Sequence, residues 1–398
     1  MASEKIERWI YLALLAFLLA SSTVPNYAIF FVAIIVAVVS ARLALASGDA
    51  RLPQAIGAIG CSMLAFFIVL PFSANIYASL RQYILIINYL VAFAIPIVFV
   101  RTEQDIIRVA LVADICLIGF GVLIALPQEL LQTPLMEKVA VFRTAFLSDA
   151  GAILVLAGNL VNLFPIFLVL SLKPSRWPVK GAFIAGLAAV FYLCWKMGTW
   201  GHLVPITAML LVWLGLAGRR EVGQVRPAAL VFVGGLLLAA GVILAKDGYY
   251  LKLGQWLSQV YGDPRLWAIF VQHPFLGTGL DTFSHFYYGY DNTGKISHAL
   301  GAMPSSYINL LLETGLVGLV GYLAMLGYLV LDNYRAWTKT AGVWPLAALL
   351  LLTGYLLATA LFHYFVIPAV MHIFYFVLGL AYVSRNNGTP ADGDKERG

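Results

Sequence analysis

Charged residues are scarce in this chain of 398 residues. Asp, Glu, Lys and Arg make up only 11% of it, whereas hydrophobic residues make up 62% and the mean hydropathy is +0.89. A soluble domain is about one quarter charged. This shortage of charge excludes a large solvated surface, and we expect most of the chain to face lipid.

Cysteine and the common cofactor motifs are also scarce. The 3 cysteines, Cys61, Cys116 and Cys194, all lie in apolar runs, so we expect neither a disulfide nor a zinc site. The Walker pattern, the dinucleotide fingerprint and the H-E-x-x-H motif do not occur. The sequence therefore offers no support for ATP hydrolysis or metalloprotease chemistry, and we expect no metal and no cofactor.

Long apolar runs recur from one end of the chain to the other. Each is long enough to cross a hydrocarbon core of about 30 Å, and each is apolar all round, which favours helices over barrel strands. We predict an all-α integral membrane protein, a bundle of about 12 transmembrane helices. The expected spans are 9–24, 27–46, 54–72, 82–100, 106–126, 150–171, 181–198, 202–217, 228–246, 306–331, 344–362 and 364–383.

The domain organisation follows from these spans. We expect transmembrane helices 1–9 in residues 1–246, and helices 10–12 in residues 306–384. A large late periplasmic loop occupies 247–305 between them, and a disordered cytoplasmic tail occupies 385–398. The first apolar stretch resembles a signal peptide, but it has a poor cleavage site and further spans follow at once, so we expect an uncleaved first span.

The basic residues predict the orientation. In a soluble chain a net charge of +6 would suggest nucleic-acid binding, but in a membrane protein the positive-inside rule explains it, and we expect no nucleic-acid partner. With a cytoplasmic N-terminus, 17 of the 25 Lys and Arg residues fall in inside segments. The bias predicts a multi-pass protein of the bacterial inner (cytoplasmic) membrane, with both termini cytoplasmic.

The late loop contains the largest polar segment of the chain. From Tyr249 to Gln272 apolar residues recur at roughly helical spacing, which predicts an amphipathic helix at the membrane surface. A glycine-rich stretch follows, with Gly277 and Gly279 in a predicted tight turn. A second predicted outside loop runs from about Pro127 to Asp149.

Two segments of this region resemble the O-antigen ligase/polymerase superfamily. The first, RLWAIFVQHPFLGTGLDTF at 265–283, has an Arg, a helix and an "HP-x-x-G-x-G" turn. The second, SSYINLLLETGLVGL at 305–319, matches the "YL-x-LL-x-ETG-x-x-G" pattern that opens the next span in that family. The close match covers about 55 residues, from Arg265 to Leu319, and the span count and the late outside loop fit as well.

The resemblance implies a metal-independent membrane glycosyltransferase. Its donor would be a glycan on an undecaprenyl diphosphate carrier, and its acceptor a hydroxyl on another glycan, on lipid A core or on a protein. The chemistry would take place on the periplasmic face, beside membrane lipid. Positioned Arg or Lys side chains can stabilise the leaving diphosphate, and a nearby base can take the hydroxyl proton.

The resemblance also implies roles for particular residues. Arg265 matches the loop arginine of the family and would hold the diphosphate through its planar guanidinium; a headgroup contact is the plainer alternative. Gly277 and Gly279 would form the turn, with their amides available to a phosphate. Arg81 and Arg143 could add charge near the donor. Headgroup contact explains Arg81 equally well, and a solvated pair with Glu137 explains Arg143 better.

The chain departs from the family pattern at two places. The family has a second arginine in an "S-R-G" motif, but Trp200 stands at that position; Lys196, or His202 if protonated, could substitute as a diphosphate ligand. The family also has a His just before the last signature helix, where this chain has Pro304, Ser305 and Ser306. His298, in the same loop, is then the candidate catalytic base. These departures favour a polymerase or a divergent ligase.

Two other classes remain open. A transporter or flippase of a lipid-linked or amphipathic substrate would have several charged residues within spans and an internal repeat, whereas we find one clear mid-span acid, Asp114, and no repeat. A peptidoglycan polymerase of the shape, elongation, division and sporulation type has a similar architecture, but it depends on an acidic loop residue in a different motif.

Overall fold

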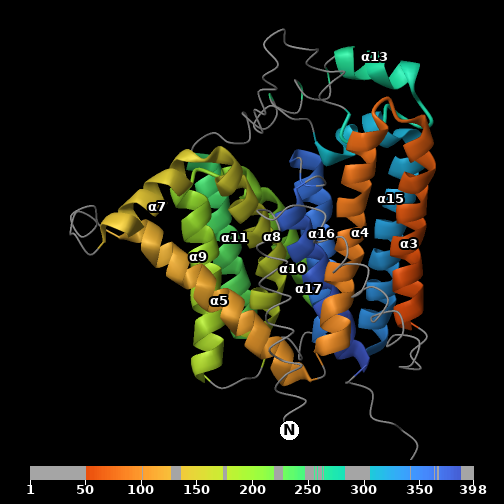
Figure 1. The fold of residues 1–398 in the computed structure, drawn as a ribbon. Coiled ribbons are helices and arrows are strands. Elements are labelled where there is room, and N and C mark those ends of the chain that lie inside the picture. The colour runs from red at the N-terminus through yellow and green to blue at the C-terminus, as the bar shows by residue number, and fades with distance from the viewer. Residues whose placement is uncertain are drawn as a thin grey trace, which may run out of the picture.

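The computed structural model describes most of the chain after residue 50. The described residues are 51–100, 102–126, 136–173, 177–218, 227–246, 255, 258, 262, 264–282, 305–340, 342–362, 364 and 367–386. They fold into helices, and no strand occurs among them (Figure 1). The predicted spans 9–24 and 27–46, most of the late loop and the C-terminal tail lie outside these residues.

Seven described helices are long and apolar enough to cross a membrane. They are α3 (Arg51–Val69, continued by the 3-10 turn η1, Leu70–Phe72), α4 (Ile76–Phe99), α5 (Glu103–Ala125), α8 (Ala150–Leu172), α9 (Trp177–Lys196), α15 (Ser306–Thr340) and α16 (Val343–Leu361). Shorter apolar stretches occur in α10 (Leu203–Gly218, preceded by η2, Trp200–His202), α11 (Pro227–Lys246) and α17 (Pro368–Asn386). The prediction of an all-α protein with several helices able to span a membrane is confirmed.

The ends of the helices differ from the predicted spans where capping and kinks decide them. Helix α4 begins at Ile76, not at residue 82, because the side chain of Asn75 accepts a hydrogen bond from the Ala78 amide (3.2 Å) and caps the helix. Helix α15 continues to Thr340, well past residue 331, through a polar last part. A search for apolar runs misses both ends, because the residue that caps α4 and the last turns of α15 are polar.

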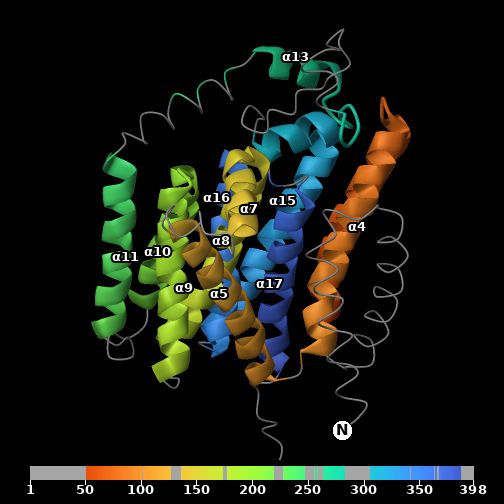
Figure 2. The same ribbon diagram turned by 60° about the vertical axis from the view of Figure 1, so that its left-hand side comes forward.

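The segment predicted as an outside loop, 127–149, contains a helix. Helix α7 (Glu137–Ser148) lies across the end of the bundle at an angle to the other helices (Figures 1 and 2). Phe146 packs edge-on against Phe120 of α5, with the ring centroids 4.8 Å apart. The composition of α7 is too polar for a span, so a search for apolar runs does not find it.

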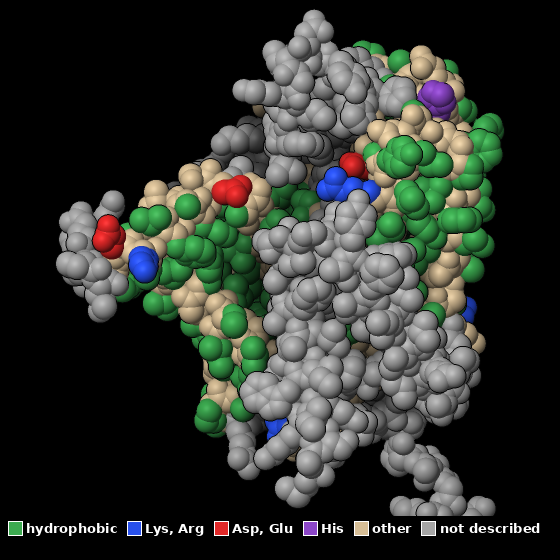
Figure 3. Space-filling view, viewed as in Figure 1, with side chains coloured by type: hydrophobic (Ala, Val, Ile, Leu, Met, Phe, Trp, Pro, Cys, Tyr) green, Lys and Arg blue, Asp and Glu red, His purple; other side chains and the backbone are tan. Residues whose placement is uncertain are grey.

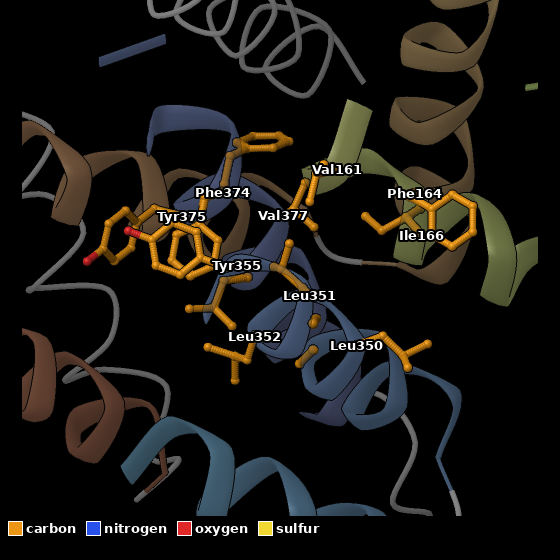
Figure 4. Close-up of a cluster of buried hydrophobic side chains, with 14 of the residues drawn as sticks. Val161, Phe164, Ile166, Leu350, Leu351, Leu352, Tyr355, Phe374, Tyr375 and Val377 are labelled. Atoms are coloured by element: carbon orange, nitrogen blue, oxygen red, sulfur yellow. The ribbon is translucent and has the colours of Figure 1, made fainter. Parts of the chain in front are cut away.

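The core of the bundle is formed by α8, α16 and α17, with α4 against α17 and α3 against α15 (Figures 1 and 2). Figure 4 shows apolar side chains from these three central helices meeting in one cluster, including Phe164 of α8, Leu351 of α16 and Phe374 of α17. Helix α5 packs mainly on α9 rather than on α4, which precedes it in the chain. Helices α5 and α9 therefore join the rest of the bundle through α8, whereas α10 and α11 join it through α16.

Polar contacts tie the helices together at the end predicted to face the cytoplasm. Lys173, directly after α8, forms an ion pair with Glu103 at the start of α5. The indole Nε1 of Trp344 in α16 donates to the same carboxylate (3.2 Å). A capping box between Thr102 and Asp105 fixes the first turn of α5 beside them. One acid thus links three helices at the predicted inner end.

The only mid-span acid that the sequence analysis singled out, Asp114, is buried against a glycine. Its exposed fraction is 0%, and neither carboxyl oxygen has a hydrogen-bond partner among the described residues. A Cβ added at Gly186 of α9 would overlap this carboxyl group. The absence of a side chain at Gly186 is therefore what lets α5 approach α9 at this depth.

We predict that Gly186→Val separates α5 from α9. The added side chain has no room beside Asp114, and overpacking of this kind costs about 1–3 kcal/mol. The measurement is the free energy of unfolding of the purified protein in detergent. Gly181→Val is the matched control, because Gly181 lies in the same helix with nothing within 4 Å of an added Cβ.

The double variant Asp114→Ala/Gly186→Val tests the cause. Removing the carboxyl group makes space for the valine, so the double variant should regain most of the lost stability. Equal losses in the single and double variants would contradict the contact as the reason for the glycine.

Candidate functional site

The residues predicted for the outer site that the structure describes belong to helices whose ends lie at the same end of the bundle. Arg81 lies in the second turn of α4, Lys196 ends α9, His202 ends η2, and α13 (Pro264–Gln272) carries Arg265 in its first turn. Figure 1 shows α13 lying across this end, opposite the end at which α5 begins. The topology thus gathers on one side residues that the orientation rule assigned to the periplasmic face.

The two segments that resemble the family signature pair through their backbones. The amides of Thr278 and Gly279 donate to the carbonyls of Leu312 (2.9 Å) and Glu313 (2.8 Å). In return, the amides of Leu316 and Val317 donate to the carbonyls of Pro274 (2.9 Å) and Phe275 (3.1 Å). We call the paired residues 273–279 and 312–317 the signature joint.

A break in α15 makes this pairing possible. Gly315 has φ +63° and ψ −164°, so α15 is interrupted there and the amides of the next two residues are released from helical bonding. A Cβ on Gly315 would overlap the backbone at Phe275, and a Cβ on Gly277 (φ +66°) would overlap the backbone at Glu313. Both glycines are required by positive φ and by close backbone approach.

The amides of the turn glycines are engaged within the protein. The Gly277 amide donates to the His273 carbonyl (3.0 Å), and the Gly279 amide donates to Glu313 as described above. Gly279 (φ +109°) also lies directly against Ser73, where a Cβ would overlap the serine side chain. This geometry favours the tight-turn role of Gly277 and Gly279 over direct contact of their amides with a phosphate.

The signature joint is also bonded to the start of α4. The Ala74 amide donates to the Thr278 carbonyl (2.9 Å), and the Ser79 hydroxyl donates to the Leu280 carbonyl (2.7 Å). The Ser73 and Ser79 hydroxyls are hydrogen bonded to each other (2.6 Å). These bonds hold the first turns of α4 against the signature joint. Arg81, whose side chain is exposed, follows two residues after Ser79.

Helix α13, which covers the last nine residues of the predicted helix 249–272, is amphipathic and rests on the first turns of α15. Its Leu266 is buried against Ile308 and Leu312, with Ile269 and Phe270 packed around them. The backbone of Arg265 therefore lies beside α15, and the helix leads directly into the signature joint. The side chain of Arg265 lies outside the described residues, as does all of His298.

A second group of residues meets the other flank of α15. The Ser306 amide and hydroxyl both donate to the Phe362 carbonyl (3.2 and 2.8 Å), and the same hydroxyl accepts from the Tyr364 amide (2.8 Å). The ring of His202 stacks on Phe362, with centroids 4.2 Å apart and planes 9° apart, and lies 5.9 Å from the Tyr364 ring. We call His202, Ser306, Phe362 and Tyr364 the aromatic joint.

The aromatic joint unites the two places where the chain departs from the family pattern. Trp200 and His202 occupy the expected arginine region, and Ser306 occupies the expected histidine region, about one hundred residues later in the sequence. The sequence pattern does not single out Phe362 or Tyr364, because they lie within an apolar stretch. Nothing in that stretch distinguishes them from residues of the core.

The other predicted basic residues occupy different positions. Lys196 is exposed at the end of α9, six residues before His202 along the chain. Arg143 of α7 is half-buried, and its Nη1 donates to the Leu126 carbonyl (2.6 Å) at the end of α5. The structure thus gives Arg143 a bracing contact between α5 and α7, without the pair with Glu137 that the sequence suggested, whereas Arg81 and Lys196 present their charge to solvent.

Among the described side chains visible in Figure 3, hydrophobic ones predominate and charged ones are few. Among the residues that the structure describes, no group of three or more His, Cys, Asp or Glu is close enough to hold a metal ion. At the end that carries α13, the described residues therefore offer a few charged side chains of both signs, one buried imidazole and many backbone groups.

No known family model matches the sequence, and the comparison with curated proteins likewise found no match.

We predict that Gly277→Ala destabilises the signature joint more than a positive φ alone explains. A non-glycine residue in the left-handed region costs roughly 1–2 kcal/mol, and overlap with the Glu313 backbone adds a further cost of about 1–3 kcal/mol. The measurement is the free energy of unfolding in detergent. Gly198→Ala is the matched control, because Gly198 has the same φ of +66° and nothing within 4 Å.

The comparison isolates the close approach. If the two variants lose equal stability, the packing of residues 273–279 on α15 is not tight, and the signature joint has no structural role.

Proposed function

We propose that this protein transfers or polymerises glycan from an undecaprenyl diphosphate carrier to a hydroxyl acceptor on the periplasmic face of the bacterial inner membrane. It would act as an O-antigen or exopolysaccharide polymerase or ligase, with a glycan, lipid A core or a protein as the acceptor. In this proposal about twelve spans surround a late periplasmic loop, and both termini are cytoplasmic.

The observation that carries the proposal is the signature joint. The "HP-x-x-G-x-G" and "ETG" segments resemble one family motif in sequence, and in space they form one unit through four backbone hydrogen bonds. A chance resemblance of two separate segments gives no reason for them to pair. The pairing at the outer end, beside Arg81 and α13, supports the interpretation of the two segments as parts of one site.

The chemistry needs positive charge at the leaving diphosphate. Arg265 begins the helix that leads into the joint, and its planar guanidinium can bind two phosphate oxygens at once. Arg81 follows the α4 turns that are bonded to the same joint, and Lys196 is exposed on the His202 side. In this proposal the three cations lie on either side of the first turns of α15, and Arg265 is the main diphosphate ligand. Gly277 and Gly279 form the turn that positions these elements.

A transporter or flippase is the alternative. Its main support is Asp114, a buried acid near the middle of a span. Asp114 is fitted closely against Gly186, which accounts for its position through packing. A transport path also needs several polar groups along its length, so the glycan-transfer proposal is the stronger of the two.

We predict that Arg265→Ala lowers glycan transfer by about 100-fold or more, because removing a group that stabilises developing charge has effects of roughly 10²–10³. Arg265→Lys should recover only part of the activity, since a lysine cannot bind two oxygens in one plane. The measurement is loss of carrier-linked glycan in membranes from a deletion strain that expresses each variant.

Arg108→Ala is the matched control for this experiment. Arg108 is an exposed arginine near the opposite end of the bundle, paired with Asp105 at 3.3 Å, and it should leave transfer unchanged. Full activity of a normally inserted Arg265→Ala would contradict the role given to Arg265.

The deletion strain itself separates the two kinds of transferase. Accumulation of short carrier-linked units, or of single-repeat glycan, indicates a polymerase. Accumulation of long carrier-linked chains that fail to reach the acceptor indicates a ligase. Unchanged surface glycans and unchanged intermediates would overturn the proposal and favour transport.

A further inference from the structure

The imidazole of His202 has one nitrogen engaged and one without a protein partner. Its Nδ1 lies 3.3 Å from the Thr199 carbonyl oxygen, while its Nε2 is buried and has no hydrogen-bond partner among the described residues. The side chain as a whole is only 3% exposed. Natural proteins rarely leave a buried polar atom unpaired, so such an atom marks a place for a water molecule or a ligand.

The engaged nitrogen determines what the other can do. A carbonyl oxygen can only accept, so Nδ1 carries the hydrogen and donates it to Thr199. In the neutral ring Nε2 then has a lone pair and can only accept. The partner that Nε2 requires is therefore a hydrogen-bond donor, such as a hydroxyl group, and not a phosphate oxygen.

The surroundings of the ring keep it neutral at rest. It lies flat on Phe362 and close to Tyr364, and a buried cation without a counter-charge is unstable. Helices α8 and α10, which pack against η2, contain no Asp, Glu, Lys, Arg or His. The described titratable groups at the same end of the neighbouring elements are Asp149 at the N-cap of α8, Tyr192, Cys194 and Lys196 of α9, Tyr307 and Glu313 of α15, and Tyr364.

The ring is also held in a defined orientation. Phe362, on which it stacks, has its carbonyl bonded by both the amide and the hydroxyl of Ser306 at the start of α15. The Thr199 carbonyl accepts from both the amide and Nδ1 of His202. A fixed ring with a free acceptor nitrogen is the arrangement that a general base requires.

We propose that Nε2 of His202 binds the acceptor hydroxyl and serves as its base, which places the hydroxyl-binding half of the site at the aromatic joint. This inference rests on the proposed glycan transfer. In this inference His202 acts as a neutral base and not as a cation that binds the diphosphate. His202, within the bundle, replaces the loop residue His298 as the candidate base.

The oxygen of the acceptor hydroxyl forms a bond to the anomeric carbon of the donor, and its proton passes to Nε2. The bond between that carbon and the phosphate oxygen breaks, and the diphosphate of the carrier leaves with the electron pair. The imidazolium then releases its proton to water, which returns the ring to the neutral form.

The test compares His202→Gln and His202→Phe with the wild type in lipid nanodiscs, using lipid extract of the deletion strain as the donor. We expect both variants to lose about 10²–10⁴-fold in the rate of transfer, the usual contribution of a general base. The wild-type rate should also fall as the pH is lowered and the ring becomes protonated, whereas the residual rate of His202→Gln should not follow this profile.

His372→Phe is the matched control. His372 of α17 is also a buried histidine beside an aromatic ring, 5.4 Å from Tyr89, and neither of its nitrogens has a hydrogen-bond partner among the described residues. It should keep the activity and the pH profile of the wild type. Normal transfer by His202→Phe, or an unchanged pH profile in His202→Gln, would overturn the role of His202 alone.

Failure of the proposed function would look different. If the wild type itself consumes no carrier-linked glycan, both the glycan transfer and the base role are overturned.

The tautomer of His202 provides a further check that needs no substrate. Nitrogen-15 spectra of histidine-labelled protein, with His202→Gln to assign the signal, should show a neutral ring with hydrogen on Nδ1; a ring with hydrogen on Nε2 would overturn the proposal.

Discussion

The end of the bundle that carries α13 depends on the backbone pairing between residues 274–279 and the interrupted helix α15. Hydrogen bonds run in both directions across it, and the positive φ of Gly277 and Gly315 lets the two backbones approach closely. Helix α13 is held by this pairing on one side, and the first turns of α4 are held on the other. Without the break at Gly315, the amides of Leu316 and Val317 would stay within the helix, and the turn would have no donors to bind.

The break has a cost that packing offsets. An interrupted helix within a span leaves backbone groups that lipid cannot satisfy, so the structure is tolerated only where other protein groups replace the lost bonds. Here the carbonyls of Pro274 and Phe275 supply the acceptors. Residues 273–279 thus accept the hydrogen bonds that the break in α15 releases, and they also allow the break to exist. This mutual dependence explains why the two segments occur together.

The proposed site has a different character on its two flanks. On the α13 and α4 side lie the arginines suited to a diphosphate, and on the α16–α17 side lies the buried imidazole suited to a hydroxyl. The first turns of α15 separate the two and contact both, through Leu312 and Ser306. A transfer between an anionic donor and a neutral acceptor requires such a division, because a cation near the hydroxyl would not help to remove its proton.

The sequence by itself determined the class of protein and the ends of most helices, because an apolar run of sufficient length can only be a helix in lipid. It also determined the amphipathic character of α13 and the two segments of the signature joint. It missed α7, whose polar composition resembles a loop, and it selected His202 only as a possible cation. The tertiary structure decided that the signature segments pair, that the amides of Gly277 and Gly279 are occupied, and that His202 meets Ser306 through Phe362. These features depend on contacts between residues far apart in the chain, and local composition carries no record of such contacts.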